Sequence, residues 1–134
     1  MGWEIDPAAL RRFLIRTQAD YTGDLPLFVT ENGMASSERQ QDFDRIDYLK
    51  RHLAAVQEAQ ARGVPVQGYF IWSLLDNYEW AFGYEKRFGL VDVDFETLER
   101  RPKASFNALK QALAQMSAPA CLWRSGQGRV AMRG

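Results

Sequence analysis

The stretch from Leu27 to Gly33 constrains the fold of this chain more than any other. Its first four residues, Leu-Phe-Val-Thr, are apolar or β-branched and lie between turn residues, which predicts a strand buried on both faces, as in parallel sheets. The strand leads directly into Glu31. A carboxylate at such a strand end is costly to desolvate without a partner, and barrels of parallel strands carry their catalytic residues at these ends. Glu31 is therefore a candidate catalytic residue, with a merely solvated carboxylate as the alternative.

Helical periodicity predicts further elements on both sides of this strand. We expect helices over residues 7–21, 43–62 and 102–116, strands over 27–31 and 66–73, a short strand over 88–94 and a turn over 97–101. Asp6-Pro7 is a typical helix start, and Gly63 a typical stop. The predicted buried stripe of the second helix is Ile46, Leu49, Leu53 and Val56. The order helix, strand, helix, strand predicts a right-handed βαβ unit with parallel strands, and hence an α/β fold.

Composition excludes several classes of function. The 134 residues suffice for one domain, and 17 basic residues balance 17 acidic ones, so we expect no nucleic-acid partner and no membrane partner. Glu4 and Asp6 interrupt any signal peptide, and the lone Cys121 excludes an internal disulfide, so a cytoplasmic location is expected. The pattern stops at Ser117, which predicts a folded segment over 1–116 and a disordered tail over 117–134.

Aromatic and acidic side chains gather in the loop that follows the second predicted strand. Because that strand and the one ending at Glu31 are expected to be parallel, both ends open onto the same rim. Sugar rings have apolar faces and polar edges, so a sugar site needs aromatic surfaces beside carboxylates. Trp72, Trp80 and Phe88 meet the first need, and Asp76 and Glu79 meet the second. In the alternative interpretation, the tryptophans cover the end of the sheet and Glu79 pairs with Lys86 or Arg87.

Six short motifs follow one another along the chain: Met1–Ile5 (MGWEI), Thr30–Gly33 (TENG), Trp72–Trp80 (WSLLDNYEW), Gly83-Tyr84, Arg87–Leu90 (RFGL) and Pro102–Phe106 (PKASF). In this order they resemble the C-terminal portion of a glycoside hydrolase family 1 β-glucosidase. The resemblance covers about residues 1 to 114. It implies a partial (β/α)8 TIM barrel consisting of the last two βα units, strands 7 and 8 with their flanking helices.

The resemblance also implies a role for each of five residues. Glu31 matches the catalytic nucleophile, and Trp72 matches the aromatic platform beneath the sugar. Glu79 matches the carboxylate that accepts hydroxyls at the far edge of that sugar, Trp80 its neighbour, and Phe88 an aromatic wall. Members acting on 6-phosphorylated sugars have serine in place of Glu79, so the expected ligand is an unphosphorylated β-glucoside or β-galactoside. No metal and no cofactor are expected.

One half of the chemistry is missing from the sequence. Retaining hydrolysis needs two carboxyl groups, and the Asn-Glu-Pro motif that carries the acid/base glutamate in this family is absent. The predicted function is therefore that of a β-glucosidase fragment with nucleophile and glycone-binding residues, inactive alone and able to self-associate through exposed strand edges. The alternatives are a non-catalytic sugar-binding remnant and a truncated product without a role of its own.

Overall fold

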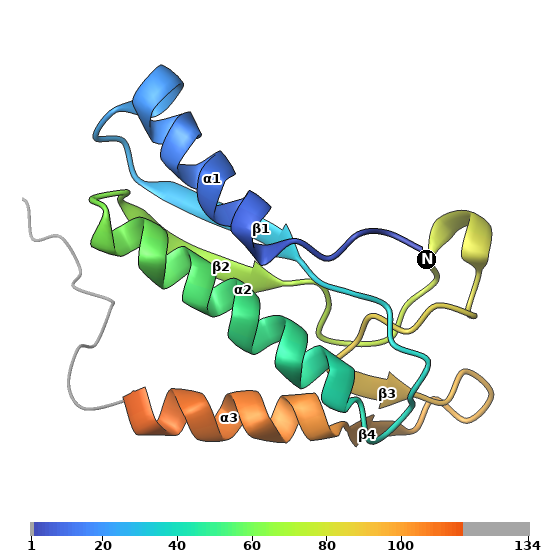
Figure 1. The fold of residues 1–134 in the computed structure, drawn as a ribbon. Coiled ribbons are helices and arrows are strands. Elements are labelled where there is room, and N and C mark those ends of the chain that lie inside the picture. The colour runs from blue at the N-terminus through green and yellow to red at the C-terminus, as the bar shows by residue number, and fades with distance from the viewer. Residues whose placement is uncertain (1, 117–134) are drawn as a thin grey trace, which may run out of the picture.

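The computed structural model describes residues 2–116, which form an α/β fold (Figure 1). The disordered tail predicted for 117–134 lies outside the described residues. The elements in order are α1 (Pro7–Thr17), the π-helical turn η1 (Gln18–Thr22), β1 (Leu27–Asn32), α2 (Phe43–Ala61), β2 (Val66–Ile71), the 3-10 turn η2 (Trp80–Phe82), β3 (Val91–Val93), β4 (Arg100–Pro102) and α3 (Ala104–Met116).

The parallel pair predicted from the chain order is confirmed. β1 and β2 lie side by side in parallel, with Phe28 opposite Gly68 and Val29 opposite Tyr69. α2 connects them, and α1 and α2 lie along the same side of the pair (Figure 1). Apolar side chains from α1, α2 and both strands form the main core beneath that side. Its buried residues are Leu14, Val29, Val56, Ala59, Val64 and Val66.

The opposite face of this two-stranded sheet carries exposed aromatic rings. Side chains alternate between the faces of a strand, and Phe28 and Phe70 keep 52% and 57% of their surface exposed. Gly68 lies between them, and a Cβ added there would come within 2.5 Å of the Phe28 ring. Within residues 2–116 no further strand pairs with β1 or β2. Parallel sheets are normally covered on both faces, so this face and both outer edges are suited to contact with further chain.

Several element boundaries differ from the sequence prediction. α1 ends at Thr17 and continues as a π-helical turn, in which the Gly23 amide donates to the Gln18 carbonyl at 2.9 Å. β2 ends at Ile71 rather than at 73. α3 begins at Ala104 rather than at 102 because residues 100–102 are taken up by β4.

The predicted turn over 97–101 is in part a strand. The Asp94 side chain accepts hydrogen bonds from the amides of Glu96 and Thr97, both at 3.0 Å, so the turn begins at Asp94, before the predicted range. The chain therefore reverses direction soon enough for residues 100–102 to form β4, which pairs antiparallel with β3. The strand predicted over 88–94 is accordingly reduced to Val91–Val93.

No helix among the described residues is long and apolar enough to cross a membrane. The cytoplasmic location rests on cysteine usage and stays a prediction.

Candidate functional site

One open pocket of about 440 Å³ lies where β1 and β2 end. All five predicted site residues line it. The complete lining is Trp3, Glu31, Asn32, Gly33, Trp72, Glu79, Trp80 and Phe88. Both strands end at the same rim because they are parallel, and this brings the lining residues after β1 close to those after β2.

The backbones that carry Glu31 and Trp72 are held in contact. The Trp72 amide donates to the Asn32 carbonyl at 3.0 Å, which extends the strand pairing by one step beyond β2. At Gly33, a Cβ would lie 1.8 Å from the Trp72 carbonyl oxygen, so a side chain at this position would push the two segments apart. Glu31 itself is exposed to solvent. The glycine after the strand therefore allows the backbone segments that carry Glu31 and Trp72 to lie in contact.

Glu79 and Trp80 reach the pocket from the short turn η2. The Glu79 carboxylate is buried, and the Asn77 side-chain amide donates to its Oε2 at 3.3 Å. The Glu79 amide donates to the Gly83 carbonyl at 2.7 Å, which closes the turn. Trp80 has a φ of +47° and keeps 82% of its surface exposed. A non-glycine residue in this region is uncommon and costs about 1–2 kcal/mol, which is a cost often accepted at functional sites.

The ion pairs proposed for Glu79 in the alternative interpretation do not form. Lys86 instead places its ammonium 5.7 Å from the centre of the Phe82 ring. Arg87 pairs with Asp76 at 3.4 Å and contacts the Phe95 ring. The Glu79 carboxylate consequently faces the pocket with an amide rather than a cation as its partner.

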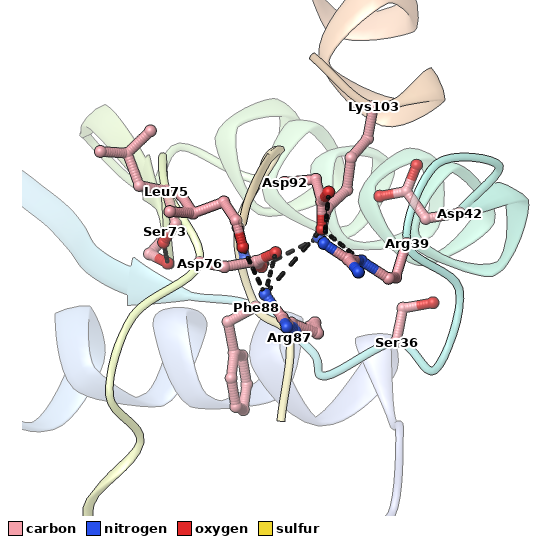
Figure 2. A network of polar contacts seen from close by, with 12 residues as sticks. Ser36, Arg39, Asp42, Ser73, Leu75, Asp76, Arg87, Phe88, Asp92 and Lys103 are labelled. Carbon is pink, nitrogen blue, oxygen red and sulfur yellow. Dashed lines mark hydrogen bonds and ion pairs between the residues drawn. The ribbon is translucent and has the colours of Figure 1, made fainter. Parts of the chain in front are cut away.

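Asp76 does not line the pocket, which corrects its interpretation as an acceptor for sugar hydroxyls. It is buried in the polar network shown in Figure 2, where its Oδ1 accepts from the Lys103 ammonium at 2.9 Å and from the Gly89 amide at 2.8 Å. Burial lowers the pKa of Lys103, and the ion pair with Asp76 opposes that shift. Asp76 therefore anchors the segment that carries Phe88 instead of meeting a ligand.

A second carboxylate completes this network. Burial raises the pKa of Asp92, but the bidentate contact from Arg39, at 3.0 Å for each bond, and the charges of Arg87 and Lys103 outweigh it, so the pKa is lowered overall. Figure 2 shows the Phe88 ring pointing away from these ion pairs. Phe88 is 3% exposed and forms one wall of the pocket.

Two features of the site escaped the sequence analysis. Trp3 lines the pocket, although the sequence analysis noted only the motif that contains it. Tyr69 donates its hydroxyl to the side chain of Asn32, the residue after Glu31, and burial raises the pKa of Tyr69. The Asn32 side chain is only half-buried, so the sequence pattern did not indicate a donor on the neighbouring strand.

The arrangement suits a polyhydroxylated ring. Indole and phenyl surfaces can lie against the C–H face of a sugar, while the two carboxylates accept hydrogen bonds from its hydroxyls. Glu31 is the carboxylate exposed in the hollow and Glu79 the buried one at its side.

Comparison with known proteins supports this chemistry. The family model for glycosyl hydrolase family 1 matches residues 1–117. A bifunctional β-D-glucosidase/β-D-fucosidase of Bifidobacterium breve is 52% identical over 128 residues, which cover 88% of this chain and 28% of the relative. A 6-phospho-β-galactosidase of Streptococcus equi subsp. zooepidemicus is 46% identical over 108 residues, covering 77% of this chain and 23% of the relative.

Solved structures match as well. A β-glucosidase from Thermotoga maritima in complex with glucoimidazole has a TM-score of 0.82 and 40% identity, over 89% of this chain and 28% of that one. The chain thus spans roughly a quarter of the length of the proteins it matches. Because the family model covers every residue that the structure describes, and because the fold is shared with a family structure at 40% identity, the chain belongs to glycosyl hydrolase family 1.

Proposed function

We propose that this chain supplies the nucleophile and the glycone pocket of a retaining β-glucosidase. In this proposal residues 1–116 are the last two βα units of a (β/α)8 barrel, with β1 as strand 7 and β2 as strand 8. The observation that carries it is the shared pocket, in which Glu31 and Trp72 from adjacent parallel strands meet Glu79, Trp80 and Phe88.

Glu31 is the residue that forms the covalent intermediate. Its carboxylate attacks the anomeric carbon, a glycosyl ester forms, and the bond to the leaving oxygen breaks. Protonation of that oxygen and activation of water require a second carboxyl group. In this family the Asn-Glu-Pro motif provides it, and residues 1–134 contain no such motif. The chain alone is therefore expected to form the ester only with leaving groups that depart without a proton.

The substrate class follows from Glu79. A carboxylate buried at the edge of the pocket repels a phosphate, whereas it accepts hydrogen bonds from free hydroxyls. The relatives include enzymes named for phosphorylated and for unphosphorylated sugars. Of these two classes we propose unphosphorylated β-glucosides or β-galactosides.

Incubation with 2,4-dinitrophenyl β-glucoside tests the assignment. The wild-type chain is expected to release about one equivalent of phenolate in a burst and then stop, because the ester forms but is not hydrolysed. Glu31→Gln should abolish the burst, while the exposed control Glu38→Gln should leave it unchanged. An equal burst from Glu31→Gln would contradict the nucleophile assignment, and sustained turnover by the wild-type chain would contradict the missing acid/base.

A sugar-binding role without cleavage is the second candidate, because the pocket retains its aromatic and acidic lining. Calorimetric titration with glucose and cellobiose distinguishes it. Binding without any burst favours this role, whereas no heat at millimolar sugar removes it.

Self-association is expected to involve the uncovered sheet face. Phe28 and Phe70 are exposed there, beside two strand edges that no other strand of residues 2–116 pairs with, and such edges pair readily with other chains. Size-exclusion chromatography should show species larger than a monomer, and the double variant Phe28→Gln/Phe70→Gln should reduce them. The matched control is Phe13→Gln, which removes an exposed ring on α1. A sharp wild-type monomer with high thermal stability would contradict this expectation.

A further inference from the structure

The side chain of Arg45, in the first turn of α2, lies almost wholly inside the protein. It is 1% exposed, and its Nε donates to the Asp42 carboxylate at 2.8 Å. Its Nη1 donates to the carbonyls of Met34 and Phe88, the latter at 2.7 Å, and its Nη2 donates to the Arg87 carbonyl at 2.8 Å. A single guanidinium therefore joins two loops that are more than fifty residues apart in the chain.

Both loops belong to the pocket. Met34 follows the pocket residue Gly33, and Phe88 is the pocket wall. The carbonyls that Arg45 binds also accept backbone amides: Ser36 donates to Arg87 at 3.0 Å, and Ser73 donates to Phe88 at 3.2 Å. Because Ser73 follows Trp72, the Arg45 guanidinium lies at the junction of the segments that carry the nucleophile, the platform and the wall.

The charge of Arg45 is compensated in place. Asp42 is fully buried and also accepts from the Ser105 amide at 2.9 Å and from the Ser105 hydroxyl at 2.6 Å. A buried ion pair of this kind contributes little net stability compared with apolar residues of the same volume, because desolvation offsets the attraction. The planar guanidinium instead donates hydrogen bonds in fixed directions to several acceptors at once, which a lysine ammonium cannot do.

We propose that Arg45 is a positioning residue that sets the distance between the segment following Glu31 and the Phe88 wall. The relevance of this role to catalysis rests on the proposed function. Arg45 itself does not line the pocket, and it bonds the lining residue Phe88 through the backbone carbonyl. Asp42 and Ser105 hold the guanidinium in orientation, so the three residues act as one support from α2 and α3.

Amide hydrogen exchange in the Arg45→Lys chain tests the proposal without any sugar. The amides of Ser36 and Ser73 are expected to exchange about tenfold faster, while amides of the β1–β2 pairing change by less than about twofold. Arg51→Lys is the matched control, since Arg51 is on the same helix but exposed and paired only with Asp47. Unchanged exchange at Ser36 and Ser73, or an equal rise throughout the chain, would refute a positioning role.

A milder variant covers the case in which Arg45→Lys does not fold. Ser105→Ala removes only the hydroxyl that orients Asp42, and it should accelerate exchange at the same two amides by a smaller factor. If exchange at these two amides is unchanged in Ser105→Ala, the proposal is overturned.

Sugar binding supplies the functional readout. If the wild-type chain binds cellobiose, Arg45→Lys should weaken that binding by about tenfold and Arg51→Lys should not; equal binding by Arg45→Lys would contradict the proposal. If the wild-type chain does not bind, the sugar-binding assignment of the pocket fails, and the exchange data alone decide whether Arg45 positions the loops. The two failures are thus told apart.

Discussion

Glu31→Gln is expected to lower kcat/KM by at least about 10⁴-fold in a complete barrel that contains this chain, because loss of a covalent nucleophile typically has an effect of that order. The barrel is obtained by replacing the matched segment of Thermotoga maritima β-glucosidase A with residues 1–116. That protein is 46% identical to this chain over 111 residues. Under the proposed function, the remainder of the chimera is expected to supply the other strands of the barrel and the acid/base, so steady-state hydrolysis of an aryl β-glucoside becomes measurable.

The control in the chimera is Glu38→Gln, which makes the same chemical change at an exposed loop position. It should alter kcat/KM by less than about twofold, as expected for a surface substitution. A Glu31→Gln chimera within about tenfold of its parent, or a folded parent chimera without activity, would contradict the assignment of the pocket.

Asp76→Ala is expected to lower the free energy of unfolding by about 3–5 kcal/mol, because it leaves the buried Lys103 ammonium without its counter-charge. The pair is fully buried, with the Lys103 Nζ 2.9 Å from the Asp76 Oδ1. Asp76 also accepts from the Gly89 amide, so the segment after Phe88 loses its anchor. Domains are stable by only about 5–15 kcal/mol, so this loss is a large fraction of the total stability of the chain.

Denaturant unfolding followed by circular dichroism measures the effect. Asp47→Ala serves as the control, since Asp47 pairs with Arg51 at the surface and should cost less than about 1 kcal/mol. A loss of under about 1 kcal/mol for Asp76→Ala would show that the buried pair does not hold the pocket wall in place.

The parallel pair and the rim could be predicted from local pattern alone. An apolar run ending in Glu31, a helix with a glycine stop and a second apolar run suffice to place β1 beside β2. The content of the loop made Glu79 and Trp80 candidates for a sugar site, but their individual roles came only from the family resemblance. Periodicity carries no information on irregular backbone such as the positive φ of Trp80.

The buried polar network could not be predicted, because its partners are distant in the chain. The stripe predicted for α2 holds at Leu49 and Val56, which are buried, but Ile46 and Leu53 are only half-buried. The helix turns Arg45 inward instead, where the carbonyls of two loops and Asp42 satisfy its charge. A charged residue at a buried position is counter to hydrophobic patterning, and only the tertiary structure reveals the acceptors that make it favourable.

The identity of the residue that carries the sugar tests the central claim most directly. A 2-deoxy-2-fluoro aryl β-glucoside slows hydrolysis of the glycosyl ester, because fluorine disfavours the oxocarbenium-like transition state. After reaction with the chimera, peptide mapping by mass spectrometry should find the sugar on Glu31 and leave Glu79 unmodified. Attachment to Glu79, or to a carboxylate outside the pocket, would contradict the account.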